Sequence, residues 1–132
     1  MRKSILPLLP LVALACTSAS SATHTPKRNL ARLEAAQPAG PPVSCIETHR
    51  IKTSHVLNDR TIDFEMIDGR TYRNTLPYEC PSLGYDEGFA YETSINRLCA
   101  VDTITVMQQI GGLHRGASCG LGEFQPVKFA KK

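Results

Sequence analysis

The sequence lacks a long apolar run, a pair of closely spaced cysteines and, beyond residue 43, a helical pattern. Its main apolar stretch, Ile5 to Ala15, is too short for a transmembrane helix and contains Pro7 and Pro10, which weaken a helix further. No segment after residue 43 has the apolar spacing of an amphipathic helix, and the chain has no internal repeat. These absences leave one small domain built mainly from strands.

The chain also has little excess charge where a domain is expected. Five of its 15 Lys and Arg residues precede residue 43, against one acid there. The remaining chain carries ten basic and eleven acidic side chains, so its formal charge is −1 although the whole chain has +3. A nucleic-acid-binding protein needs a concentrated basic face to displace counterions from phosphates. We therefore expect no nucleic-acid partner.

Residues 1–15 have the three features of a secretory signal peptide. Arg2 and Lys3 form the basic start, residues 5–15 form the apolar middle, and Ala13-Leu14-Ala15 is a small-x-small cleavage site. We therefore expect an exported protein.

Cleavage after Ala15 would leave Cys16 as the first mature residue. This is the arrangement of the lipobox, in which the cysteine after the cut is modified with lipid, although Ala13 departs from the leucine most common at its position. The alternative is ordinary cleavage, either here or after Ala22. We expect a lipoprotein on the periplasmic side of a bacterial membrane, held there by a lipid anchor at Cys16. Without the lipid, the protein would be periplasmic or secreted.

Residues 16–42 are predicted to be a disordered tether. They are rich in Ser, Thr, Ala and Pro, a composition that buries too little apolar surface to fold. The stretch from Asn29 to Ala36 could form a helical turn or two, but it is too short to be stable alone. The folded domain is expected to span residues 43–132.

About six short strands are predicted in this domain, which favours a small antiparallel barrel or a rolled sheet in the all-β class. They are rich in β-branched and aromatic residues and are separated by turn residues: Val43–Leu57 with an interruption near Lys52–Ser54, Ile62–Met66, Arg70–Leu76, Gly88–Thr93, Leu98–Val106 and Cys119 to about Phe129.

The Asp68-Gly69 turn joins two of these strands, and its length follows from side-chain parity. A two-residue loop would place Tyr72 on the polar face, opposite Glu65. A three-residue loop, with Gly69 in the left-handed bulge position, would pair Phe64 with Tyr72 and keep the apolar residues together. We therefore predict the three-residue loop.

Leu98–Val106 is the most strand-like run and is predicted to be the central strand. Within it, Asp102 falls on the same face as Ile104 and Val106. A carboxylate on an apolar face needs hydrogen-bond partners or a cation. The ordinary explanation is that Asp102 accepts hydrogen bonds from turn amides or an arginine, and the alternative is that it contacts a ligand.

Five cysteines in so short a chain favour an oxidising compartment. Without Cys16, four remain, an even number suited to two disulfides. Zinc sites usually contain close cysteine pairs, whereas these four are 35, 19 and 20 residues apart. We therefore expect two disulfides that staple the domain, formed by Cys45, Cys80, Cys99 and Cys119. We expect no metal and no cofactor.

The pattern Cys-Pro-Ser-Leu from Cys80, Leu-Cys-Ala-Val-Asp from Leu98 and Cys-Gly-Leu-Gly-Glu-Phe from Cys119 resembles a family of exported bacterial domains of unknown function. The resemblance covers roughly residues 45–127. It implies a small exported β domain and supplies no activity. It also implies that Cys80 pairs with Cys119, which leaves Cys45 for Cys99.

Several tyrosines lie in sequence around the Cys80 loop, among them Tyr78, Tyr85 and Tyr91. Most aromatic residues in this region should be core, but loops on a stapled scaffold commonly carry binding residues. These three tyrosines, together with Asp102, are the predicted binding residues, and no catalytic residue is predicted.

The sequence favours a non-catalytic binding or structural module of the cell envelope, with an unidentified envelope protein or ligand as its partner. One alternative is an inhibitor of a secreted hydrolase, by analogy of architecture. The alternative of a different class is a small hydrolase or isomerase that uses Asp102 with a histidine, such as His49 or His55.

Overall fold

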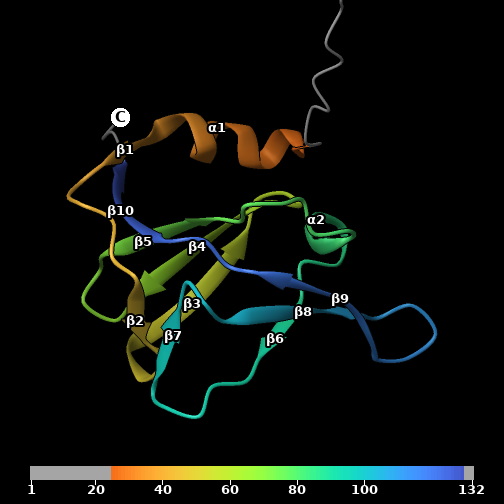
Figure 1. The fold of residues 1–132 in the computed structure, drawn as a ribbon. Coiled ribbons are helices and arrows are strands. Elements are labelled where there is room, and N and C mark those ends of the chain that lie inside the picture. Colours follow the sequence, from red (N-terminus) through yellow and green to blue (C-terminus); the bar gives the residue numbers. More distant parts are fainter. Residues whose placement is uncertain (1–24, 130–132) are drawn as a thin grey trace, which may run out of the picture.

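The computed structural model describes residues 25–129 (Figure 1), which form a mostly β domain with two helices and a short 3-10 turn. The elements in chain order are α1 (Lys27–Ala35), β1 (Ala36–Pro38), β2 (Cys45–Glu47), the 3-10 turn (Thr48–Arg50), β3 (Ile51–Val56), β4 (Thr61–Met66), β5 (Thr71–Thr75), α2 (Leu83–Asp86), β6 (Phe89–Tyr91), β7 (Arg97–Cys99), β8 (Thr103–Gln108), β9 (His114–Gly120) and β10 (Phe124–Phe129).

The strands form three antiparallel sheets. The largest has the order β1-β10-β5-β4-β3, the second pairs β2 with β7, and the third has the order β6-β8-β9. The prediction of an all-β domain with two disulfides is confirmed, but the sheets do not close into a barrel. The described residues contain ten strands, compared with about six predicted, because three predicted strands are each divided and β1 was not predicted.

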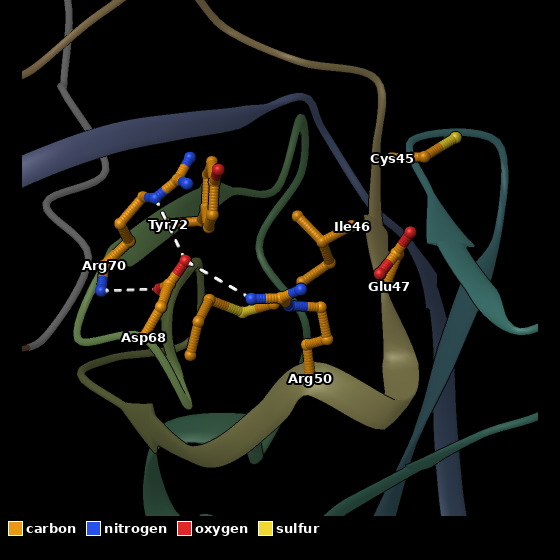
Figure 2. Close-up of a pocket in the computed structure, with 8 residues that line it drawn as sticks. Cys45, Ile46, Glu47, Arg50, Asp68, Arg70 and Tyr72 are labelled. Carbon is orange, nitrogen blue, oxygen red and sulfur yellow. Dashed lines mark hydrogen bonds and ion pairs between the residues drawn. The ribbon is translucent and has the colours of Figure 1, made fainter.

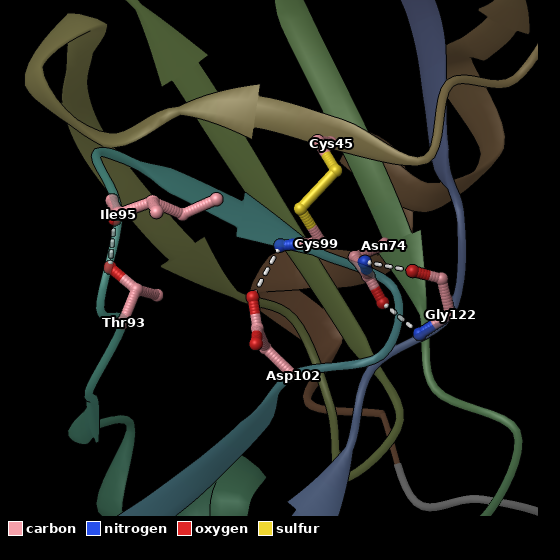
Figure 3. The surroundings of a disulfide bond; sticks show 7 residues. All are labelled: Cys45, Asn74, Thr93, Ile95, Cys99, Asp102 and Gly122. Atoms are coloured by element: carbon pink, nitrogen blue, oxygen red, sulfur yellow. Dashed lines mark hydrogen bonds between the residues drawn. A yellow bond between two sulfur atoms is a disulfide. The ribbon is translucent and has the colours of Figure 1, made fainter.

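The predicted central strand Leu98–Val106 is wrong, because a turn divides it into β7 and β8. The Asp102 carboxylate accepts a hydrogen bond from the Cys99 backbone N–H at 2.7 Å (Figure 3). The Asp102 N–H also donates to the Cys99 carbonyl at 2.9 Å. A short side chain that bonds the backbone locally is a common way to end a strand. Leu98 and Ile104 are both fully buried, but they belong to different sheets.

The β4–β5 hairpin has the three-residue loop that side-chain parity predicts. Phe64 pairs with Tyr72, and the Met66 N–H donates to the Arg70 carbonyl at 2.8 Å. Gly69 has a φ of 89°, the left-handed conformation that this bulge position requires. The loop thus keeps Phe64 in the core, where its ring meets Phe124 edge-on with centroids 5.7 Å apart.

The two disulfides have the pairing that the family resemblance implies: one lies within the two-stranded sheet, and the other links a loop to the three-stranded sheet. Cys45–Cys99 joins β2 to β7, and Cys80–Cys119 joins the loop before α2 to β9. Cys80 is fully buried within the core, so this second bond also fills core volume.

A side-chain clamp separates β9 from β10, which were predicted as one strand. The buried Asn74 amide donates to the Gly122 carbonyl at 2.7 Å and its oxygen accepts from the Gly122 N–H at 2.9 Å (Figure 3). A Cβ atom at Gly122 would lie 2.3 Å from the Thr75 carbonyl oxygen, so only glycine allows this approach. The close approach is specific to Gly122, since a Cβ atom at the nearby Gly120 would meet no atom within 4 Å.

The predicted disordered tether is wrong for residues 27–38, which form α1 and β1. In Figure 1, α1 crosses one face of the large sheet, and β1 pairs with β10 at the edge of that sheet. A short helix becomes stable when tertiary contacts hold it, as described below. The predicted signal peptide and Cys16 lie outside the described residues. Among residues 25–129, no helix has the length and apolar character needed to cross a membrane.

Candidate functional site

Asp102 accepts a hydrogen bond from a turn amide, which is the ordinary explanation for a carboxylate at this position. It is half-buried, and its carboxylate accepts the Cys99 backbone N–H in the turn between β7 and β8. The carboxylate therefore shapes the chain beside the Cys45–Cys99 disulfide (Figure 3).

The histidines of the described chain interact elsewhere. His49 lies 3.5 Å from Glu47, and His55 lies 3.4 Å from Glu65. His114 contacts the Gly111 carbonyl at 3.2 Å. Within residues 25–129, no hydrogen bond or ion pair joins Asp102 to a histidine.

The three predicted tyrosines have different environments. Tyr91 lies in β6, is half-buried and packs beside Phe89 with ring centroids 6.5 Å apart, which makes it part of the core. Tyr78 and Tyr85 are 83% and 77% exposed. A single exposed ring needs no explanation, but exposed rings with other apolar residues beside them often mark a binding surface.

Tyr85 meets that condition. It lines a hollow of about 180 Å³ together with Ile110, which is itself 73% exposed. Tyr85 also lines a larger hollow of about 500 Å³ with Pro26 and Arg28 at the start of α1. We call Tyr85 and Ile110, with the other residues of their shared hollow, the Tyr85 surface; the others are Ser82, Asp86 and Gln108.

The backbone around Tyr85 is strained and firmly held. Ser82 and Glu87 flank α2 with φ values of 66° and 58°, and they are the non-glycine residues with positive φ in the described chain. Such residues cost about 1–3 kcal/mol each and are concentrated at binding and active sites. Asp59 fixes this conformation, because its carbonyl accepts the Cys80 N–H at 2.7 Å and its carboxylate accepts the Gly84 N–H at 2.8 Å.

A second site lies between β2 and the β4–β5 hairpin (Figure 2). It is a pocket of about 220 Å³ whose charged lining residues are Glu47, Arg50, Asp68 and Arg70. Figure 2 shows the Asp68 carboxylate between the two guanidinium groups. One Asp68 oxygen lies 3.1 Å from Arg70 Nε and 3.7 Å from Arg50 Nη2. The pocket thus places two cations around one carboxylate. The sequence does not predict this pocket, because Arg50 and Arg70 are 20 residues apart and come together only when the chain folds.

The third polar cluster holds α1 against the sheet. Asp63 is fully buried, and Arg73 pairs with both of its oxygens, at 2.7 Å and 2.9 Å. Arg32 of α1 reaches the same carboxylate at 2.9 Å and also covers the Phe129 ring at 4.5 Å. Asn29 donates to the Leu57 carbonyl at 2.8 Å. This helix is therefore held mainly by polar contacts, and Asp63 has a structural role.

The described residues contain no group of three or more His, Cys, Asp and Glu side chains arranged to hold a metal ion. Comparisons with family models, with curated proteins and with solved structures found no match, so the resemblance to exported bacterial domains stays a prediction. The Tyr85 surface and the pocket between β2 and the hairpin are the candidate binding sites in the described part of the chain.

Proposed function

We propose that the chain is an exported protein of the bacterial cell envelope that acts as a binding module without catalysis of its own, and that the Tyr85 surface contacts a partner protein there. The observation that carries this proposal is the exposure of Tyr85 and Ile110 around one hollow, from elements far apart in the sequence. Exposed apolar side chains that gather across elements are typical of protein–protein contacts.

The rigidity of this surface supports the same proposal. The Cys80–Cys119 disulfide links the loop that carries α2 to β9, and β9 pairs with β8, which leads into Ile110. A surface that is already ordered loses little conformational entropy on binding, so more of its contact energy appears as affinity.

The compartment is supported by two independent features. The two disulfides are compatible with a location outside the cytoplasm, since such bonds persist in oxidising environments. Residues 1–15 have the features of a signal peptide, and Cys16 stands where a lipobox places its modified cysteine. The proposal therefore includes a lipid anchor at Cys16.

Replacing Cys16 with serine is expected to move the protein from the membrane fraction to the soluble fraction of the periplasm or the medium. The reason is that the lipid would be attached to the cysteine sulfur, which serine lacks. Fractionation of cells that express the full chain, followed by intact mass of the processed protein, measures both location and modification. Unchanged membrane association of Cys16→Ser would contradict the lipid anchor, and free thiols in the processed wild type would contradict export into an oxidising compartment.

Replacing Tyr85 with a photoreactive amino acid is expected to give one discrete crosslinked adduct in cells that export the full chain. Adding Ile110→Asp should remove the adduct, because a charge in the shared hollow opposes apolar contact. The matched control is Val101→Asp, since Val101 is 91% exposed but lies in the turn between β7 and β8. The measurement is the adduct on an immunoblot and its identity by mass spectrometry.

The control variant separates a specific contact from general stickiness. An adduct that persists with Ile110→Asp, or that Val101→Asp removes equally, would overturn the Tyr85 surface as the contact. A photoreactive residue at the exposed Lys52 position should give no such adduct.

The β8–β9 hairpin favours a second candidate, an inhibitor of a secreted hydrolase. In Figure 1 this loop extends away from the body of the domain. Its tip presents Ile110 and Leu113, which are 73% and 70% exposed, and contains Gly111 and Gly112 with positive φ. An inhibitor needs such a projecting segment to enter an active-site cleft. Loss of a hydrolase's activity on addition of the domain, relieved by Leu113→Asp, would favour this candidate over the general binding module.

A further inference from the structure

The pocket between β2 and the β4–β5 hairpin is separate from the Tyr85 surface. We infer that this pocket binds a carboxylate that is attached to an apolar group, such as the carboxyl terminus of a peptide with an aliphatic last residue. The inference goes beyond the proposed protein contact and depends on a different set of residues.

The two guanidinium groups provide the donors. Each guanidinium has five N–H donors, and Asp68 is the ion-pair partner of both Arg50 and Arg70 among the described residues. Asp68 Oδ2 pairs with Nε of Arg70 at 3.1 Å and lies 3.7 Å from Nη2 of Arg50. The remaining N–H groups can therefore donate to a second carboxylate that bridges the two arginines.

The arginine backbones are already positioned for this contact. The Arg50 carbonyl accepts the Ile67 N–H at 2.8 Å, and the Arg70 N–H donates to Asp68 Oδ1 at 3.0 Å. Both arginines are thus attached to the same tight turn. A ligand would need to order only their side chains, which lowers the entropic cost of binding.

The remaining walls select an apolar group. Ile46 and Met66 are each 5% exposed and line the pocket together with the half-buried Tyr72. The volume of about 220 Å³ is smaller than the 300–1,000 Å³ typical of pockets that enclose a whole small molecule. The pocket therefore suits one end of a ligand, with a single carboxylate and one aliphatic group.

The charge balance favours a carboxylate over a phosphate. The formal charges of Arg50, Arg70, Glu47 and Asp68 cancel, so the pocket has no net positive charge to offset a dianion. Glu47 is also half exposed at the pocket, where it would repel a second negative charge on a ligand. A singly charged carboxylate can contact the arginines while staying away from Glu47.

The test is titration calorimetry of the processed protein carrying Cys16→Ser with the dipeptide N-acetyl-Ala-Leu as the free acid and as the carboxamide. The free acid is expected to bind at least about tenfold more tightly, because charge-assisted hydrogen bonds form only with the carboxylate. Arg50→Gln and Arg70→Gln should each weaken binding of the acid about tenfold, and Glu47→Gln should strengthen it. The matched control is Arg115→Gln, since the Arg115 side chain is 71% exposed and that of Arg70 is 70% exposed.

The other outcomes are equally decisive. Equal affinity for acid and carboxamide, full binding by Arg50→Gln and Arg70→Gln, or binding of inorganic phosphate as tight as that of the acid would overturn the inference. Comparison with 4-methylpentanoate identifies the source of the carboxylate: equal affinity indicates a free organic acid, and weaker affinity indicates a peptide terminus. Either result supports binding of a carboxylate that is attached to an apolar group. The Tyr85 adduct should be unaffected by Arg70→Gln, so failure of this inference is distinguishable from failure of the proposed function.

Discussion

Replacing Asp63 with asparagine is expected to lower the free energy of unfolding by about 3–5 kcal/mol, the range for removing one partner from a buried ion pair. Asp63 is fully buried, and the Arg73 side chain is 12% exposed. The asparagine would leave the Arg73 guanidinium with its charge uncompensated in a region that water hardly reaches. A domain of this size has a total stability of about 5–15 kcal/mol, so the loss would be a large part of it.

Urea unfolding of the purified domain, followed by circular dichroism, measures this effect. The matched control is Glu65→Gln on the same strand, since the Glu65 side chain is 32% exposed and contacts Lys52 and His55 near the surface. That variant should lose no more than about 1 kcal/mol. The double variant Asp63→Leu with Arg73→Met should recover much of the loss, because it removes both buried charges. A wild-type midpoint for Asp63→Asn would contradict the account.

Removing the Cys80–Cys119 disulfide, by replacing both cysteines with alanine, is expected to cost about 4 kcal/mol from loop entropy alone. The bond closes a loop with a sequence separation of 39 residues. Cys80 is also fully buried in the core, so its replacement by alanine leaves unfilled volume as well. We therefore expect a larger loss than for the alanine double variant of Cys45 and Cys99, which are half-buried and whose sequence separation is 54 residues.

The comparison of the two double variants is the informative measurement. Chain entropy differs little between the two loops, so a larger loss for Cys80 and Cys119 would report the packing of the buried cysteine. Equal losses would contradict a packing contribution, and no loss in either variant would contradict the role of the disulfides as staples. Wild-type protein unfolded in the presence of a reducing agent provides the reference in which both bonds are absent.

Local patterns in the sequence predicted part of the fold correctly. The Asp68-Gly69 turn was predictable because the side-chain period of a strand allows only one loop length that keeps Phe64 and Tyr72 together. The break at Asp102 was not predictable from the same period. The residues around it form strands readily, and the turn depends on a single side-chain bond to the Cys99 N–H.

Long-range contacts explain the other differences. Asp63 alternates with apolar residues, which is the pattern of a strand with one face in water, but α1 covers that face through Arg32. Of the predicted binding tyrosines, Tyr85 lies at an exposed hollow and Tyr91 packs in the core. The sequence gives no means to distinguish them, because exposure depends on which elements pack nearby.

If Cys16 carries a lipid, the docking of α1 would also limit how far the domain could move from the membrane. With Thr25 bound to Asn58 at 2.9 Å and Arg32 bound to Asp63, a chain anchored at Cys16 would have only residues 16–24 as its leash between the anchor and the folded body, instead of the 16–42 segment predicted to be a tether. At full extension nine residues reach about 30–32 Å. Pro26 and Arg28 line the hollow beside Tyr85, so the leash would begin next to the proposed contact surface. A partner of an anchored protein would then have to present its own surface within this distance of the lipid headgroups.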